Sequence, residues 1–345
     1  MPTIKDVARR AGVSTMTVSR VINNADYISQ ETRERVEQAI AELDYLPNAL
    51  ARSLRFKQTK TIALVLTDFA NPFFTGVLRG VEDAAVAQGF SVLFCNTDES
   101  EQVERDYLSI LMQKQVDGVL LVPATAHSEA ATQLRVRGVP LVAIDRRMHT
   151  PVDTVRGDSE RAAHALTRHL IELGHRQIAA ITGPTDVSTA NDRLAGYGRA
   201  LAEVGIPLNP DLICVDDFMT EGGYRSTQRL LHAPVRPTAI FAGNNFIAFG
   251  AFRALREAGL SVPDDLSLVT FDDLPSSWLM SPFLTTANQP AYEIGQRATE
   301  LLIARLNGEA DTDPREIVLP VELIIRRSSA PPHDDRPRLP VKTLE

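Results

Sequence analysis

The sequence predicts an α/β protein in which a small three-helix domain precedes a two-lobed domain with doubly wound parallel sheets. Three apolar helical patterns lie within the first 43 residues. From residue 61 onward, short runs of Val, Ile, Leu and Ala alternate with amphipathic stretches. Such alternation is typical of parallel strands connected by helices that cover both sheet faces. At 345 residues the chain is long enough for two or three domains.

Composition favours a soluble globular protein. Hydrophobic residues make up 44% of the chain and charged residues 23%. No apolar run approaches the roughly 18 to 20 residues of a membrane helix, and the polar start is unlike a secretory signal, so we expect a cytoplasmic protein without membrane contact. Cys95 and Cys214 lie in apolar strand-like segments, which favours buried thiols over a disulfide or a metal site.

The charge is unevenly distributed along the chain. The net charge is −8, yet residues 1–60 hold ten Lys and Arg against seven Asp and Glu, a balance of +3. The remaining residues therefore carry −11. The amino-terminal end is the part suited to a polyanion.

The amino-terminal helices follow one another at the spacing of a helix-turn-helix domain. Apolar residues recur at i, i+3, i+4 and i+7 over residues 4–11, and Gly12 permits a sharp turn. Ser14 can cap a second helix, and a third follows over about 29–43. Two short helices joined by a tight turn and supported by a third form this motif. A helical cap without a partner is the alternative.

In a helix-turn-helix domain the second helix enters the DNA major groove. Arg20 can donate two parallel hydrogen bonds to a guanine edge, while Met16 and the threonine methyl groups suit thymine methyl groups. Other hydroxyl and amide side chains nearby are better placed for phosphates, which set register rather than sequence.

A second DNA-contacting segment follows Pro47. Residues 48–54 form about two helical turns, fewer than the roughly 12 to 15 residues at which an isolated helix becomes marginal in water. Such a helix should form only against a partner. Leu54 near its end is an exposed apolar side chain unless it wedges between base steps in the minor groove.

Residues 3–23 and 45–54 together resemble the signature of the lactose/galactose-repressor (LacI/GalR) family of bacterial transcription regulators. The resemblance implies a hinge helix that folds on operator DNA and a dimer that binds a near-palindromic site. It also implies an allosteric repressor, most often of carbohydrate-metabolism genes. The residues expected at the DNA are Ile4, Ser14, Thr15, Met16, Thr17, Ser19, Arg20, Asn23, Tyr27, Thr32, Tyr45, Asn48, Ala51, Arg52 and Leu54.

The rest of the chain resembles a periplasmic sugar-binding protein of type I up to about Ser328. Strands are expected at 61–67, 90–96, 117–122, 140–145, 177–182, 213–217, 238–242 and 266–271. Helices are expected at 73–88, 101–115, 127–137, 159–173, 190–204, 221–232 and 245–258. The resemblance implies that the chain crosses between two lobes near residues 159, 289 and 324.

These expectations divide the chain into five parts. Residues 1–46 are the helix-turn-helix domain, and 47–60 are the hinge helix and linker. Residues 61–160 with 290–328 make the first lobe, and 161–289 make the second. Residues 329–345 have too little apolar content to pack and are expected to form a flexible tail.

Polar and aromatic residues at the strand ends are expected to line an effector site, because open parallel sheets bind ligands beyond the carboxyl ends of their strands. Aromatic rings can cover a sugar face, carboxylates accept from hydroxyls, and Arg or amides bridge neighbouring hydroxyls. The candidates are Asn71, Phe73, Phe74, Asp145, Arg146, Arg193, Phe218, Asn244, Asp272 and Gln289. Each has a structural alternative: the two phenylalanines as core, Asp145 with Arg146 as an ion pair, Asp272 as a loop cap.

One departure from the family pattern concerns the helix after the 238–242 strand. Relatives often carry Asn-Asp where this chain has Asn244-Asn245, so one carboxylate is lost. We expect Asn245 to cap that helix.

Three other functions remain to be compared. A purine-type or nucleoside effector would favour more aromatic surface in place of Arg146. A transport-type solute-binding protein would share the cleft but need export. An enzyme is disfavoured because the sequence contains no dinucleotide fingerprint, phosphate loop or nucleophile elbow, and His164, His169 and His175 do not share a helical face. We therefore expect no catalytic residue, no cofactor and no metal. The expected partners are operator DNA, a small sugar-like effector and a second copy of the chain, in a dimer or higher oligomer.

Overall fold

The computed structural model describes residues 2–22, 27–46, 58–274, 282–310 and 313–332. The chain forms two compact units, Met1–Thr59 and Lys60–Glu345. Each unit is described separately below.

The first unit contains three helices, α1 (Ile4–Ala11), α2 (Thr15–Ile22) and α3 (Gln30–Glu42). A capping box begins α1, and a left-handed glycine at position 12 ends it with φ of 66°. The Ser14 hydroxyl accepts a 3.0 Å hydrogen bond from the Thr17 amide at the start of α2. Fully buried valines from all three helices form the core. The expected helix-turn-helix arrangement is confirmed.

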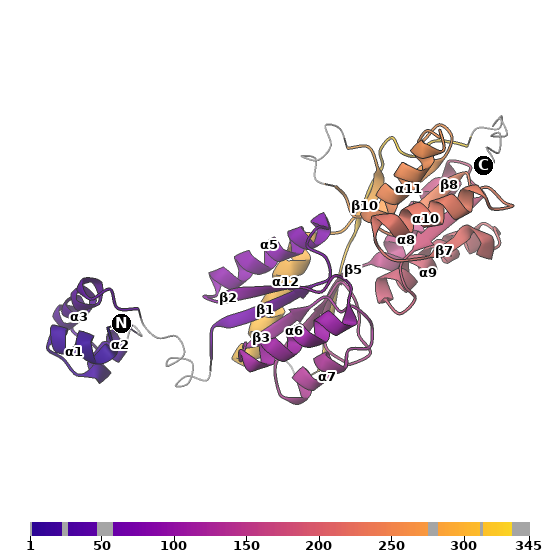
Figure 1. Ribbon diagram of the computed structural model, residues 1–345. Coiled ribbons are helices and arrows are strands. Elements are labelled where there is room, and N and C mark those ends of the chain that lie inside the picture. The colour runs from indigo at the N-terminus through magenta and orange to yellow at the C-terminus, as the bar shows by residue number, and fades with distance from the viewer. Residues whose placement is uncertain (1, 23–26, 47–57, 275–281, 311–312, 333–345) are drawn as a thin grey trace. The chain divides into compact units, whose positions relative to one another are not determined.

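The first lobe of the second unit contains a parallel six-stranded sheet of order β11-β5-β4-β3-β1-β2. Its strands are β1 (Thr61–Leu66), β2 (Ser91–Asn96), β3 (Gly118–Leu121), β4 (Leu141–Ile144), β5 (Asp153–Gly157) and β11 (Glu316–Leu319). Its helices are α5 (Pro72–Ala87), α6 (Glu101–Gln113), α7 (Glu129–Val136) and α12 (Ala291–Asn307). Helices α5 and α12 pack side by side over one face (Figure 1), and α6 and α7 cover the other.

The second lobe repeats this plan. Its sheet has the order β12-β10-β9-β8-β6-β7, and only β12 runs antiparallel to its neighbour. The strands are β6 (Ile178–Thr182), β7 (Ile213–Val215), β8 (Ala239–Ala242), β9 (Ser267–Phe271), β10 (Thr285–Asn288) and β12 (Glu322–Ile324). The helices are α8 (Ser159–Glu172), α9 (Ser188–Glu203), α10 (Thr220–Leu231) and α11 (Asn245–Glu257), with a 3₁₀ turn at Pro210–Leu212. Helices α8 and α9 cover one face, and α10 and α11 cover the other. The doubly wound fold class is confirmed.

The chain crosses between the lobes after β5, after β10 and after β11. The third crossing falls at residues 320–321, and the expectation near 324 was wrong. Residues 322–328 therefore belong to the second lobe, because β12 pairs with β10 and the Ser328 hydroxyl donates to the Leu268 carbonyl at 2.5 Å.

The flexible tail was expected to begin at residue 329, but the packed part of the chain extends further. Ser328 is fully buried, and the Ala330 amide donates a 3.0 Å hydrogen bond to the hydroxyl of Ser267. His175, which is also fully buried, contacts the Ala330 carbonyl at 2.9 Å. Residues 329 and 330 thus pack against the second lobe, and residues 333–345 lie outside the described part of the chain.

Four strands among the described residues were absent from the sequence-based expectation: β5, β10, β11 and β12. Their sequences DTVRG, TTAN, EIVL and ELI are short and mixed in polarity. Continuous apolar runs identified the other strands. Strands β5, β10 and β12 carry no such run, whereas the run of three apolar residues in β11 was overlooked. Cys95 and Cys214 are buried free thiols, as expected. No helix in the described ranges is long and apolar enough to span a membrane.

Glycines permit the closest helix contacts. A Cβ on Gly196 of α9 would lie 2.1 Å from the Glu160 carbonyl oxygen of α8. Gly198 on the same helix has only the Leu208 side chain nearby, at 3.5 Å. We expect Gly196→Ala to destabilise the protein by about 1–3 kcal/mol or more, since helix backbones must move apart.

Gly198→Ala is the matched control. It should be neutral or stabilise by up to about 1 kcal/mol through helix propensity. Urea unfolding of both variants measures the difference, and equal effects would show that the α8–α9 contact does not depend on this approach.

Candidate functional site

The exposed face of α2 carries the side chains expected to contact DNA bases. Thr15, Met16 and Arg20 are exposed, while Val18 and Val21 on the opposite side are buried in the core. The Arg20 guanidinium lies 5.2 Å from the centre of the Tyr27 ring. This face presents hydrogen-bond donors and apolar groups to a groove, which is the chemistry of base contact.

Other residues expected at the DNA are placed differently. The hydroxyls of Ser14 and Thr17 lie 2.9 Å apart at the start of α2. Ser19 and Thr32 are half-buried, and Ser29 caps α3 through the Thr32 amide. Ile4 and Tyr45 pack against the helical core rather than projecting from it. The remaining expected residues, Asn23, Asn48, Ala51, Arg52 and Leu54, lie outside the described residues.

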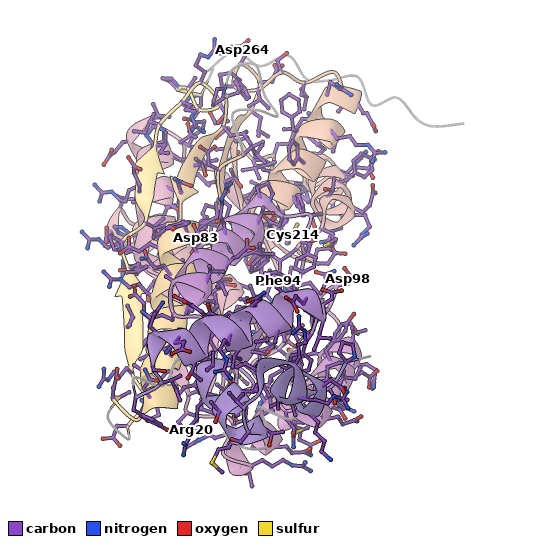
Figure 2. All side chains as sticks on the ribbon, turned by 90° about the vertical axis from the view of Figure 1, so that its left-hand side faces the viewer. Arg20, Asp83, Phe94, Asp98, Cys214 and Asp264 are labelled. Atoms are coloured by element: carbon purple, nitrogen blue, oxygen red, sulfur yellow. The ribbon has the colours of Figure 1, made fainter. Side chains whose placement is uncertain are left out.

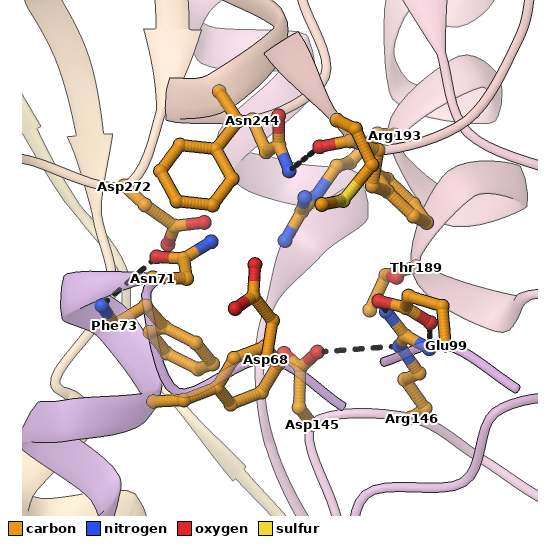
Figure 3. Close-up of a pocket in the computed structure, with 14 residues that line it drawn as sticks. Asp68, Asn71, Phe73, Glu99, Asp145, Arg146, Thr189, Arg193, Asn244 and Asp272 are labelled. Carbon is orange, nitrogen blue, oxygen red and sulfur yellow. Dashed lines mark hydrogen bonds and ion pairs between the residues drawn. The ribbon is translucent and has the colours of Figure 1, made fainter. Parts of the chain in front are cut away.

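A polar cavity lies between the two lobes at the carboxyl ends of their strands (Figure 3). Side chains from both lobes line it. The first lobe supplies Asp68, Asn71, Phe73, Phe74, Glu99, Asp145 and Arg146. The second supplies Thr189, Arg193, Phe218, Met219, Asn244, Phe246 and Asp272. Nine of the ten residues expected at the effector site therefore surround one cavity.

Asp145 and Asp272 occupy equivalent places in the two lobes. Asp145 directly follows β4 and Asp272 directly follows β9. Both have left-handed backbones, with φ of 65° and 63°, and both donate their amide to the adjacent strand, to the Val155 and Ala287 carbonyls. The repeated turn aims two buried carboxylates at the same space from opposite sides.

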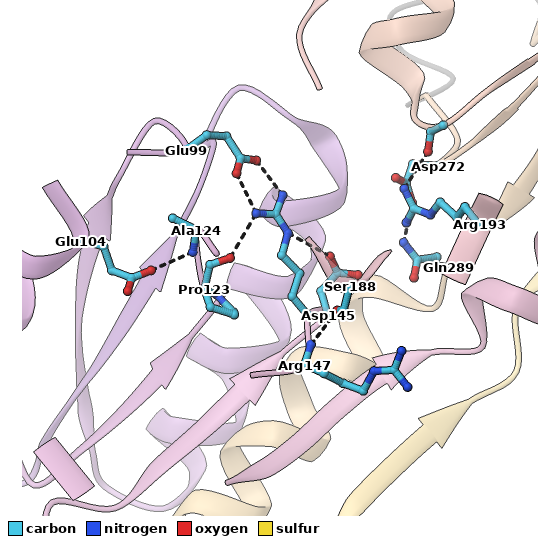
Figure 4. Close-up of polar contacts among 12 residues, drawn as sticks. Glu99, Glu104, Pro123, Ala124, Asp145, Arg147, Ser188, Arg193, Asp272 and Gln289 are labelled. Atoms are coloured by element: carbon cyan, nitrogen blue, oxygen red, sulfur yellow. Dashed lines mark hydrogen bonds and ion pairs between the residues drawn. The ribbon is translucent and has the colours of Figure 1, made fainter. Parts of the chain in front are cut away.

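Arg146 is held by a carboxylate that the sequence did not single out. Its two terminal nitrogens donate to the two Glu99 oxygens at 2.6 Å each, and one also donates to the Pro123 carbonyl at 3.1 Å (Figure 4). Arg146 is 4% exposed. The expected ion pair with Asp145 is longer, at 3.9 Å. Arg146 is thus fixed and largely neutralised by Glu99, so it is less free to bridge ligand hydroxyls than we expected.

Arg193 on α9 is the cation of the second lobe. Its guanidinium stacks 4.1 Å from the centre of the Phe271 ring, and Nη1 donates to the Gly243 carbonyl at 2.6 Å. Its charge lowers the pKa of both Asp145 and Asp272, although burial raises each of them more. The charge of one guanidinium group therefore stabilises the ionised form of two buried carboxylates.

Asn71 and Asn245 connect the lobes through a reciprocal pair of amide hydrogen bonds. Asn71 Nδ2 donates to Asn245 Oδ1 at 3.2 Å, and Asn245 Nδ2 donates to Asn71 Oδ1 at 3.1 Å. Asn244, not Asn245, caps α11, since its side chain accepts from the Ile247 amide at 2.8 Å. Our expectation that Asn245 would be the cap was wrong, because Asn245 is the first residue inside the helix and its side chain contacts Asn71 of the other lobe.

Further contacts connect the two lobes. The Arg147 amide donates to the Ser188 hydroxyl at 2.8 Å, and the Arg147 side chain pairs with Asp192. The Ala126 amide donates to the Asp186 carbonyl at 3.1 Å. These bonds join the lobes beside the cavity.

Comparison with known proteins identifies the family. The model described as bacterial regulatory proteins, lacI family, matches residues 3–48. The model described as periplasmic binding proteins and sugar binding domain of LacI family matches residues 59–327. The chain belongs to the LacI family.

Relatives of this LacI-family regulator match it over nearly its whole length. It is 40% identical to the ribose operon repressor of Escherichia coli (strain K12), over 96% of this chain and 100% of that one. It is 40% identical to the transcriptional repressor PurR of Erwinia tasmaniensis, over 96% and 97%. Among solved structures, the lac repressor dimer bound to operator matches with a TM-score of 0.84 and 31% identity, over 95% and 99%. The protein is therefore a DNA-binding transcription regulator with a periplasmic-binding-protein-like domain, and the resemblance found in its sequence is confirmed.

In this LacI-family chain, Gln289 lies behind the cavity instead of lining it. Its amide nitrogen donates to Asp272 Oδ1 at 2.9 Å, so it orients that carboxylate. Five lining residues were missed: Asp68, Glu99, Thr189, Met219 and Phe246. Asp68 and Glu99 follow the expected strands 61–67 and 90–96 closely, so the strand-end rule could have found them. Thr189, Met219 and Phe246 lie at the starts of α9, α10 and α11, to which the strand-end rule was not extended.

The pH dependence of stability tests the buried environment of Asp145. Burial raises the pKa of Asp145 from its ordinary value of 3.8 to about 6. The folded protein thus binds this proton more tightly than the unfolded chain does, and its stabilising contribution, present at low pH, is lost as pH rises from about 4 through about 6. Asp145→Asn should gain about 3 kcal/mol of stability relative to wild type between pH 4 and pH 7.

The measurement is the free energy of unfolding in urea for both proteins at intervals of one pH unit. All other titrating groups are shared by the two proteins, so the difference between the curves isolates Asp145. A difference that does not change with pH would contradict the assigned burial of its charged form.

Proposed function

We propose that this LacI-family regulator is a repressor that binds a near-palindromic operator as a homodimer and responds to a small sugar-like effector in the cavity between its lobes. The observation that carries the proposal is the cavity itself. Carboxylates, guanidinium groups and an amide from both lobes surround it together with phenylalanine rings. Alternating acceptors and donors beside apolar rings suit a molecule with several hydroxyls on a flat carbon face.

Similar proteins support this effector class and the dimer. One solved LacI-family regulator from Enterococcus faecium, 33% identical over 79% of this chain, holds bound ribose, with a TM-score of 0.69. A cellobiose complex of the regulator CelR is 35% identical over 95% of this chain, with a TM-score of 0.73. The lac repressor structure is a dimer on operator DNA.

The proposed base readers are Thr15, Met16 and Arg20, with the hinge segment 47–60 as a second contact. The proposed effector contacts are the cavity residues, with Asp145, Arg193 and Asp272 at the centre. Because a regulator that acts on operator DNA works where the DNA lies, we place it in the cytoplasm. We propose no enzymatic activity: a ligand bound in the cavity should be recovered unchanged.

A nucleoside or purine effector is the second candidate. Phe73, Phe74, Phe218 and Phe246 supply more ring surface than the sequence suggested. The Arg146 guanidinium, however, lies 5.4 Å from the centre of the Phe218 ring and already covers one ring face. Sugars therefore fit the remaining polar surface better.

The test is to select an operator from random DNA with the full chain, then to measure its affinity at fixed salt with and without candidate effectors. A coupling of about 1–3 kcal/mol should change operator affinity about 5- to 150-fold. A ligand that demonstrably occupies the cavity and leaves operator affinity unchanged would contradict the proposed regulation. A nucleoside that changes it when no sugar does would favour the second candidate.

A further inference from the structure

The cavity carries more negative than positive charge. Four carboxylates line it, from Asp68, Glu99, Asp145 and Asp272, against the two guanidinium groups of Arg146 and Arg193. If all are ionised, the lining has a formal surplus of two negative charges. Figure 3 shows the Asp68, Asp145 and Asp272 side chains around the same space as that of Arg193.

Both arginines are engaged by the protein, although the Nε of each is buried without a hydrogen-bond partner among the described residues. Glu99 engages both terminal nitrogens of Arg146 at 2.6 Å, and the Pro123 carbonyl takes a further donor at 3.1 Å. Arg193 donates to the Gly243 carbonyl and faces two carboxylates at once. A phosphate or carboxylate entering the cavity would have to compete with these bound acids.

Asp68 has no cation opposite it among the described residues. Its Oδ1 accepts a 2.8 Å hydrogen bond from the Ala70 amide in its own loop. Burial and the charges of Asp98 and Glu99 raise its pKa. The Asp68 carboxylate therefore adds negative charge to the cavity without being neutralised by the protein.

A second observation is a buried carboxylate oxygen in the lining that lacks a hydrogen-bond donor. Asp145 is 5% exposed, and its Oδ1 is buried without a hydrogen-bond partner among the described residues. A buried acceptor without a donor is costly. Hydroxyl or ammonium groups of a ligand can satisfy it, whereas phosphate and carboxylate groups bring further acceptors and like charge.

We propose that the cavity takes a neutral or aminated polyhydroxylated ligand, rejects sugar phosphates and uronates, and owes this charge preference chiefly to Asp68. The proposal rests on the cavity being the effector site. It goes beyond the proposed function by naming the permitted ligand charge and the residue that sets it. Like-charge juxtaposition is an effective means of excluding wrong ligands.

The test compares matched ligands on the full chain by thermal shift and calorimetry at pH 7.5. The ligands are ribose with ribose 5-phosphate, glucose with glucosamine, glucose 6-phosphate and glucuronate, and adenosine with adenosine monophosphate. Wild type should be stabilised by one or more neutral or aminated members. The anionic partner of each binding ligand should bind at least 10-fold more weakly.

Two variants test whether Asp68 sets the preference for neutral or aminated ligands. Asp68→Asn keeps the acceptor for the Ala70 amide and removes the charge, so it should narrow the neutral-to-anionic affinity ratio by about 10-fold. For an aminated ligand it should lower affinity by a similar factor. Asp98→Asn removes an exposed charge in the neighbouring loop (Figure 2), and Asp98 does not line the cavity. This variant should leave the neutral-to-anionic affinity ratio and the affinity for an aminated ligand within about 3-fold of wild type.

The outcomes are distinct from those of the proposed function. Tightest binding by a phosphate or uronate, or no stabilisation by any neutral or aminated member, overturns the charge preference. An unchanged ratio in Asp68→Asn, or an equal change in Asp98→Asn, overturns the role of Asp68. Binding of adenosine in place of the sugars, with the monophosphate rejected, refutes the sugar effector but upholds the charge preference.

Discussion

Replacing Arg193 with methionine is expected to destabilise the Lys60–Glu345 unit by about 1–3 kcal/mol at pH 7, because the buried Gly243 carbonyl loses its donor and two buried carboxylates lose the cation that lowers their pKa. Arg193 is 3% exposed, and Asp145 and Asp272 are 5% and 6% exposed. Methionine has a similar reach and keeps the apolar contact with Phe271. The loss should shrink toward pH 5, where protonation removes the uncompensated charges.

The control is Arg199→Met, on the same helix. Arg199 is about half exposed and pairs with Glu160 at 2.5 Å, a surface ion pair whose loss should cost less than about 1 kcal/mol. Urea unfolding followed by circular dichroism measures both. If the two variants lost equal stability, or if the Arg193 effect were the same at pH 5 and pH 7, the shared-cation arrangement would be refuted.

Arg20→Ala is expected to reduce specific operator binding far more than binding to unrelated DNA. A bidentate contact between an arginine and a guanine is worth about 1–3 kcal/mol, so two copies on a symmetric operator contribute about 2–6 kcal/mol. That corresponds to a loss of roughly 30-fold to 10⁴-fold in affinity. Binding to unrelated DNA depends on phosphate contacts and should fall much less.

Arg9→Ala provides the comparison, since it removes the same charge from the exposed end of α1, where Arg9 pairs with Asp6. It should weaken specific and unrelated DNA to the same modest extent. Fluorescence anisotropy at two salt concentrations, with the selected operator and a scrambled duplex, measures both ratios. A proportional loss on both duplexes for Arg20→Ala would show that Arg20 contacts phosphate rather than a base.

The fold was largely predictable because its elements carry local patterns. The helix-turn-helix follows from helical apolar spacing over residues 4–11 and from glycine at position 12. The central strands are continuous apolar runs, fully buried in the structure at β3, β4, β6 and β8. Strand β12 is short and mixed in polarity, so the last crossing between the lobes was misplaced.

The position of the site in the fold was predictable from the sequence. The contacts that its residues make with one another were less predictable. Strand ends, together with the resemblance to sugar-binding proteins, located nine of the cavity residues, because parallel strands bring their carboxyl ends to one edge. The role of Arg146 was not predictable, since Glu99 lies 47 residues away in sequence. The same is true of Asn245, whose partner Asn71 lies 174 residues away.

The sequence by itself determined the alternation of strands and helices up to residue 271, the family, the groove-facing side of α2 and the region where a ligand site would lie. Periodicity, caps and strand ends are properties of neighbouring residues, so they can be found along the chain. Only the tertiary structure decided that Glu99 neutralises Arg146, that Arg193 serves two carboxylates and that Asp68 faces the cavity without a cation. Electrostatic balance depends on distances between groups far apart in sequence, and folding sets those distances.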